Sequence, residues 1–202
     1  MPTQMEIIEW QQFIENGFSS DGKLVSMTVG IFDGVHRGHQ VLLRQVVSHN
    51  ADYEPVVVTF RQNHKTYNHQ PISNNAQQKE IISFQERLTM FKNIGIKTTI
   101  IVDFSQDFRQ MLGKDFLQIL LDHCNIGFFA IGCDFKCGYK LDTDAKSIQK
   151  FFSSHNIPVE IVPQIMEGSL PISSSRIREA ISDGDLTLAK SMLGQASPFF
   201  AI

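Results

Sequence analysis

The sequence predicts an α/β domain in which a parallel sheet is covered by helices on both faces. Apolar runs of strand length alternate with helical patterns along the 202 residues, which is typical of parallel strands joined by helical crossovers. The strand-like runs are apolar throughout rather than at every second position, which indicates strands that are buried on both faces. The length suits one domain that buries about 70% of the surface its unfolded chain exposes.

The predicted elements follow one another in the order that such a sheet requires. Strands are expected where apolar residues run without interruption, and helices where apolar residues recur every three or four positions. Ser83 and Glu86 form a capping box at the start of one helix, Gly95 ends that helix, and Asp185 caps another. In chain order we expect a leading helix at 5–16, a strand at 24–32, a helix at 39–49, strands and helices in turn at 55–60, 83–95, 97–102, 113–125, 128–132, 143–155 and 159–165, a helix that begins at serines 173–175, and a final helix at 186–193.

A polar segment at residues 61–82 interrupts this pattern. It is rich in Asn, Gln and His and shows no clear periodicity. Connections within compact domains have a median length of about 4–6 residues, and much longer ones are usually functional lids or disordered segments. We expect this segment to form a flap on the substrate side.

The composition excludes several classes of partner. A formal net charge of −3 provides no overall positive field for nucleic acid, and no apolar run reaches the roughly 18 residues that span a bilayer. The three cysteines, at positions 124, 133 and 137, suit neither a paired disulfide framework nor a tetrahedral metal site, and no signal-peptide pattern is visible. We expect a cytoplasmic protein without nucleic-acid, membrane or protein partners.

The segment at residues 29–39 carries two histidines where the first strand meets a helix. His36 and His39 are three residues apart and share one helix face, and a helix start presents unpaired N–H groups with a partial positive charge. Three glycines let the backbone turn sharply and approach a ligand. The segment therefore predicts a phosphate site. Ordinary surface or N-cap histidines are the alternative, because short motifs arise often by chance.

A second anion-binding pattern lies at residues 171–178. Three consecutive serines, Ser173 to Ser175, open a helix and are followed at once by Arg176. Hydroxyls, helix-start amides and a guanidinium all donate to phosphate oxygens. An N-cap serine followed by helix-surface arginines is the alternative. Ligands of parallel sheets bind beyond the carboxyl ends of the strands, so we expect both patterns and the loop at 133–138 to meet at one crevice.

Residues 30–39 and 172–178 together resemble the paired signatures of the adenylyltransferase module of bacterial bifunctional FAD synthetase, the riboflavin kinase/FMN adenylyltransferase family. His-x-Gly-His alone is shared by the wider nucleotidyltransferase superfamily. The likeness extends over about residues 24–193. It implies a Rossmann-like, doubly wound fold with five parallel strands in a single domain, residues 1–202.

The resemblance also implies an activity, the transfer of AMP from ATP to FMN to give FAD and pyrophosphate. Mg2+ is expected to bridge the phosphates mainly through water. The family's riboflavin kinase module is expected to be absent, with residues 194–202 as the remainder of a linker to it. Two other functions stay open: a nucleotide- or flavin-binding homologue with little catalysis, and a nucleotidyltransferase that acts on another phosphorylated acceptor, such as phosphopantetheine, nicotinate mononucleotide or glycerol phosphate.

The resemblance assigns roles to residues of both patterns and of the flavin side. The catalytic residues that it implies are His36, His39, Ser174 and Arg176. The ATP-binding residues are His36, His39, Ser174 and Arg176 together with Gly30, Phe32, Asp33, Gly34, Gly38, Ser173 and Ser175. The flavin-binding residues are Phe60, Asn63, His64, Asp134, Phe135 and Lys136. No metal ligand is assigned; Asp33 is expected to serve magnesium or turn positioning, or to be an ordinary Asp-Gly turn.

The chain departs from the family at two places on the flavin side. The family's Arg-Phe-Gly reads Lys136, Cys137 and Gly138 here, and the family's Phe-Asp-Pro-His-Pro is replaced at residues 60–64 by a segment without either proline. Both changes concern the flavin rather than ATP. We expect them to affect FMN affinity and the catalytic rate more than ATP binding.

Overall fold

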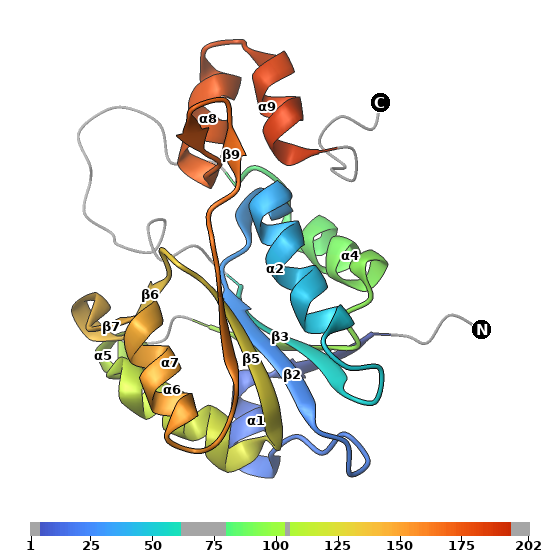
Figure 1. The fold of residues 1–202 in the computed structure, drawn as a ribbon, viewed down its shortest axis with the longest axis vertical. Coiled ribbons are helices and arrows are strands. Elements are labelled where there is room, and N and C mark those ends of the chain that lie inside the picture. The colour runs from blue at the N-terminus through green and yellow to red at the C-terminus, as the bar shows by residue number, and fades with distance from the viewer. Residues whose placement is uncertain (1–4, 62–79, 104–105, 195–202) are drawn as a thin grey trace.

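A parallel sheet forms the centre of the fold (Figure 1). In the computed structural model, which describes residues 5–61, 80–103 and 106–194, six parallel strands have the order β1-β4-β3-β2-β5-β8. The strands are β1 (Glu6–Glu9), β2 (Val25–Gly30), β3 (Glu54–Phe60), β4 (Thr98–Val102), β5 (Ile126–Gly132) and β8 (Val159–Val162). The α/β class and the parallel sheet predicted from the sequence are confirmed, with one strand more than expected.

The additional strand is β1, where the sequence predicts the first part of a helix. Residues 5–16 divide into β1 and helix α1 (Trp10–Asn16). Ile8 lies opposite Ile100 of β4 and is buried, whereas Ile7 is exposed at this edge of the sheet. Adjacent β-branched residues favour an extended backbone, but four residues are too few to reveal a period. The prediction of one continuous helix is therefore wrong in its first part.

Helices cover both faces of the sheet, as predicted (Figure 1). One face carries α2 (Arg37–Ser48) and α4 (Phe84–Ile94), and the other carries α1, α5 (Gln106–Gln110), α6 (Gly113–His123) and α7 (Ala145–Ser153). Helices α8 (Ser174–Ser182) and α9 (Leu186–Leu193) lie beyond the end of the sheet, and their apolar residues join the core layer of α2 and α4. The short elements are the 3-10 turns Asp33–Val35 and Tyr139–Leu141, the pair β6 (Lys136–Cys137) and β7 (Thr143–Asp144), and the pair β9 (Met166–Glu167) and β10 (Leu170–Pro171). No helix in the described residues is long and apolar enough to cross a membrane.

The core consists of two apolar layers, one on each face of the sheet. Val57 and Phe91 belong to the layer under α2 and α4, and Val58, Phe13 and Phe129 belong to the layer on the opposite face. Successive strand residues point to opposite faces, so the neighbours Val57 and Val58 enter different layers. Both faces of each central strand are therefore buried, which explains why these strands are apolar throughout.

The strand order places a switch point between β2 and β5. The chain continues from β2 to β3 on one side and later returns to β5 on the other side. The carboxyl ends of strands at such a point form the usual ligand site of an open α/β sheet. The segment that follows β2, residues 31–39, is called the histidine loop below. It begins at the position where a ligand site is expected.

Candidate functional site

The histidine loop has an uncommon backbone. Phe32 (φ 56°), Gly34 (φ 78°) and Val35 (φ 39°) all have positive φ angles, which side chains of L-residues rarely allow. The Phe32 ring packs so closely over Gly30 that a Cβ there would lie 2.9 Å from a ring carbon. Strained conformations of this kind persist only where surrounding contacts hold them, and they cluster at functional sites. This turn redirects the chain from β2 into α2.

His36 and His39 lie side by side at the start of α2. His36 caps the helix, because its Nδ1 accepts a hydrogen bond from the backbone N–H of His39 at 3.3 Å. The two rings stack with centroids 3.6 Å apart and planes 19° apart. A Cβ on Gly38 would lie 3.2 Å from the His36 ring, so glycine leaves room for the stack. Since Nδ1 of His36 accepts, the neutral ring carries its proton on Nε2, where it can donate to a ligand.

Both imidazoles are uncharged at neutral pH. Burial lowers the pKa of His36 from 6.5 to about 4, although the negative charge of Asp134 partly opposes this. Burial also lowers the pKa of His39 well below 6.5, and the neighbouring His36 and Arg87 lower that pKa further. The Nδ1 atom of His39 is buried and has no hydrogen-bond partner among the described residues. Each uncharged ring can donate one hydrogen bond and carries no positive charge.

This burial predicts a loss of stability at mildly acidic pH. An unfolded histidine titrates near 6.5, so between pH 6.5 and 4 the unfolded chain binds a proton that folded His36 excludes, and the free energy of unfolding falls as the pH falls. His36 contributes a loss of about 2 kcal/mol between pH 7 and pH 5. In urea unfolding at both pH values, His36→Gln should lose less stability than the wild type. Exposed His155→Gln is the matched control, and an equal loss in all three proteins would contradict the prediction.

Asp33 connects the histidine loop to distant parts of the chain. Its Oδ1 accepts a hydrogen bond from the backbone N–H of Ile81 at 3.0 Å, and its Oδ2 forms an ion pair with Arg178 of α8. Its backbone carbonyl accepts a hydrogen bond from the Ser174 hydroxyl at 2.9 Å. Asp33 is buried, and both carboxylate oxygens are engaged. Among the roles considered for Asp33, these contacts support turn positioning.

The described residues do not fit a magnesium ion held by the protein alone. Mg2+ prefers six oxygen ligands, commonly one or two carboxylates with water and substrate phosphates. Both carboxylate oxygens of Asp33 are already bound to donors. Within residues 5–61, 80–103 and 106–194, no group of three or more His, Cys, Asp or Glu side chains could hold a metal ion. We therefore assign no metal ligand.

The serine motif, residues 173–178, starts helix α8. Ser173 is the N-cap and accepts a hydrogen bond from the backbone N–H of Arg176 at 3.2 Å, as the alternative interpretation predicts for one serine. The Arg176 guanidinium donates to carbonyls of the β9–β10 hairpin, including that of Glu167 at 3.0 Å. Ser175 is exposed in the first turn of the helix. Ser173 and Arg176, like Ser174, are predicted to bind ATP but make hydrogen bonds within the protein.

The histidine loop and the serine motif are in contact, as the sequence predicts. Besides the bonds made by Asp33, Arg37 of α2 forms an ion pair with Glu167 at 2.5 Å. Gln40 of α2 donates from Nε2 to the carbonyl of Leu193 in α9 at 2.9 Å. Figure 1 shows α8 and α9 beyond the end of the sheet, beside the start of α2. The starts of α2 and α8, which are far apart in the sequence, therefore lie together beyond the same end of the strands.

The predicted flavin residues after β3 are described only in part. Phe60 is 5% exposed and belongs to the core layer on the face opposite α2. In this structure the Phe60 ring packs in that core layer. Asn63 and His64 lie outside the described residues, as does most of the predicted flap at 61–82. A role of these residues toward flavin stays a prediction.

The predicted flavin residues after β5 lie beside the histidine loop. Asp134 is exposed and accepts a hydrogen bond from Nε2 of Gln164 at 3.2 Å. Asp134 is also near enough to His36 to raise its pKa. Phe135 is half-buried, and Lys136 is exposed in β6. This loop therefore forms the neighbouring part of the same strand switch point.

The roles of two arginines at the site, the half-buried Arg178 and the buried Arg87, were not predicted. Arg178 lies in the serine motif itself, and its pairing with Asp33 has no local signal. Arg87 is 2% exposed in α4 and donates a hydrogen bond to the carbonyl of Ile31. Arg87 occupies the apolar stripe of its helix, three residues after Phe84. An arginine at a core position of an amphipathic helix is uncommon, and this is the signal that could have found it.

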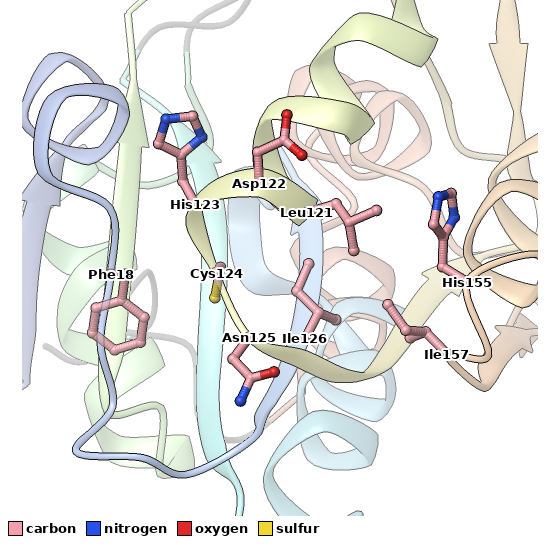
Figure 2. A pocket seen from close by; sticks show the side chains of 9 residues that line it. All are labelled: Phe18, Leu121, Asp122, His123, Cys124, Asn125, Ile126, His155 and Ile157. Carbon is pink, nitrogen blue, oxygen red and sulfur yellow. The ribbon is translucent and has the colours of Figure 1, made fainter.

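A pocket of about 530 Å³ lies away from this site (Figure 2). Its lining comes from the carboxyl end of α6, the amino end of β5, the segment that follows α7, and Phe18. Figure 2 shows its two histidines on opposite sides. Nδ1 of His123 bonds to the carbonyl of Ile119 at 2.9 Å, and Nδ1 of His155 bonds to the carbonyl of Phe151 at 2.9 Å. Each ring is thus tied to its own helix.

The fold and the site define a Rossmann-like α/β protein with two stacked histidines at a helix start beside the strand switch point. The model of the FAD synthetase family matches residues 19–176, which include the histidine loop and the start of the serine motif. The chain belongs to the FAD synthetase family.

Known proteins similar to this chain include longer enzymes. The chain is 30% identical over 173 residues to the bifunctional riboflavin kinase/FMN adenylyltransferase of Escherichia coli (strain K12), which covers 83% of this chain and 53% of that protein. It is 26% identical over 183 residues to the FAD synthetase of Listeria monocytogenes serovar 1/2a, with 87% and 71% covered. A solved macrolide-efflux protein from Streptococcus pneumoniae superimposes with a TM-score of 0.76 at 25% identity, over 95% of this chain and 62% of that chain. The chain spans about half the length of the bifunctional relatives.

Proposed function

We propose that this chain transfers AMP from ATP to FMN and thereby forms FAD and pyrophosphate. The observation that carries the proposal is the pair of stacked, uncharged imidazoles at the start of α2, joined to the serine motif through Asp33. Membership of the FAD synthetase family supports the choice of substrates, as does likeness to proteins named FMN adenylyltransferase. The loop after β5 supplies the flavin side in this proposal.

The reaction needs alignment and charge stabilisation rather than a protein base. A phosphate oxygen of FMN is already an anion and attacks the α-phosphorus of ATP directly. The bond between that phosphorus and the bridging oxygen breaks, and its electron pair leaves with pyrophosphate. His36 and His39 donate hydrogen bonds to the α-phosphate oxygens, where charge shifts in the transition state. The first N–H groups of α2 add a partial positive charge.

The start of α8 holds the departing β- and γ-phosphates. Ser175 is exposed there beside the first N–H groups of the helix, and helix starts favour anions. Ser173, Ser174 and Arg176 give this region its shape through their hydrogen bonds within the protein. ATP is bound as its magnesium complex, so the metal ion belongs to the substrate.

The direct test is to incubate the purified protein with Mg-ATP and FMN and to measure FAD by chromatography and pyrophosphate by a coupled assay. We expect equal amounts of both products. Riboflavin is the matched control acceptor because it lacks the attacking phosphate. Pyrophosphate release with phosphopantetheine, nicotinate mononucleotide or glycerol phosphate, but not with FMN, would support a different acceptor. Flavin binding without any product would identify a binding protein.

A further inference from the structure

Arg87 is a buried cation behind the histidine loop. It is 2% exposed, on the side of α4 that packs against the sheet. In the described part of the chain, no carboxylate lies within 4.0 Å of its guanidinium as an ion-pair partner. The guanidinium instead donates to the backbone carbonyls of Ile31 and Arg61, the second at 3.5 Å. Burial lowers the pKa of Arg87, and the more distant carboxylates of Glu80 and Asp33 only partly oppose this. Because burying a cation without a directly bonded carboxylate is costly, this arrangement points to a use other than stability.

The two carbonyls lie directly after the carboxyl ends of the neighbouring strands β2 and β3. Ile31 follows β2 and directly precedes Phe32, whose left-handed backbone begins the turn into α2. Arg61 follows β3, which pairs with β2 in the sheet. The Arg87 guanidinium also lies 4.9 Å from the centroid of the Phe84 ring, which fixes its place on α4. One side chain therefore holds the ends of β2 and β3, and the histidine loop follows β2 directly.

The same turn is in contact with a site histidine. The Phe32 ring packs edge to face against the His39 ring, with centroids 5.3 Å apart. On its other side, Phe32 contacts Phe91 of α4 with centroids 5.5 Å apart. Arg87 also lies close enough to lower the pKa of His39. Direct contacts thus lead from Arg87 through Ile31 and Phe32 to the His39 ring.

We propose that Arg87 is a positioning residue, which holds the Ile31 carbonyl, fixes the Phe32 turn and thereby orients the His39 ring for the bound nucleotide. The last part rests on the proposed function. Arginine can donate to two carbonyls in one plane, whereas lysine is a single flexible donor. Methionine fills similar space and donates nothing. A comparison of arginine, lysine and methionine at position 87 therefore distinguishes a role in positioning, which needs the donors, from a role in packing, which needs only the volume.

The test combines NMR of the histidine rings in ligand-free, 15N-histidine-labelled protein with steady-state kinetics. We expect Arg87→Met to shift the His39 ring signals while those of His123 and His155 stay unchanged. We also expect kcat to fall about 100-fold with a much smaller change in KM for ATP, since a small misplacement of a catalytic group can cost this much. Arg87→Lys should give intermediate values. Arg44→Met, on the exposed side of α2, is the matched control and should match the wild type in both measurements.

Unshifted His39 signals in folded Arg87→Met protein would overturn the proposal, and so would shifted signals with an unchanged kcat. If Arg87→Met does not fold, the spectrum of Arg87→Lys decides in the same way. A wild type that forms no FAD would reject the proposed function. The NMR signals of the His39 ring in the variants would still support or overturn the positioning by Arg87. A failure of the proposed function can therefore be distinguished from a failure of this inference.

Discussion

Replacing His39 by alanine is expected to lower kcat for FAD formation by a factor of about 100 or more, because a donor aimed at transition-state charge contributes about 3–4 kcal/mol. The His39 ring suits this role because it stacks on His36 at 3.6 Å and is uncharged at neutral pH. An interaction made only in the transition state affects kcat, whereas uniform binding affects KM. Steady-state kinetics with FMN and Mg-ATP therefore measure the relevant quantity.

Two further variants give this experiment its controls. His39→Asn keeps a side-chain N–H donor and is expected to retain more activity than His39→Ala. His155→Ala removes an exposed histidine beside the distant pocket and should leave kcat unchanged. Circular dichroism establishes that each variant is folded. A folded His39→Ala protein with near-normal kcat would contradict the proposed role of His39 in stabilising the transition state.

Replacing Arg178 by methionine is expected to lower the free energy of unfolding by about 3–5 kcal/mol, as measured by urea unfolding. Arg178 pairs with Asp33, and their side chains are only 16% and 6% exposed. Removing the guanidinium leaves the carboxylate of Asp33 buried without this counter-ion. The same pair joins α8 to the histidine loop, so FAD formation should fall together with stability.

A double-mutant cycle isolates the ion pair from other effects. Asp33→Asn combined with Arg178→Met leaves neither charge buried, so the double variant should lose less stability than the sum of the two single variants. Arg44→Met is the matched control for an arginine on an exposed helix surface. Additive losses, or a loss below about 1 kcal/mol in Arg178→Met, would show that the pair is not a buried determinant of stability.

The sheet could be predicted from the sequence because strands buried on both faces leave a continuous apolar run. Val57 and Val58 illustrate this, since they are adjacent and enter different core layers. Helix ends could be predicted where a cap marks them, as Ser83 and Asp185 do. The edge strand β1 gives no such signal, because it is short and exposes Ile7 to solvent.

The place of the site could be predicted, but its internal contacts could not. The spacing of His36 and His39 predicts that the two rings lie together at the start of α2. His36 reaches this place as the N-cap of the helix, with an extended backbone, rather than as a helical residue. Ser174 bonds to the carbonyl of Asp33, which lies 141 residues earlier in the chain. Arg176 is likewise bound by carbonyls of a hairpin that has no strong sequence signal. A local sequence pattern does not show which distant groups a side chain contacts. The pattern around Ser174 and Arg176 therefore predicted phosphate binding rather than these contacts within the protein.

The central claim is that the starts of α2 and α8 hold one ATP molecule between them. A crystal structure with α,β-methylene ATP, which cannot release pyrophosphate, tests this most directly. We predict the triphosphate between these two helix starts, with an α-phosphate oxygen within hydrogen-bond distance of His36 or His39. A triphosphate bound elsewhere, for example in the pocket beside His123 and His155, with no phosphate at the histidine loop, would contradict the account.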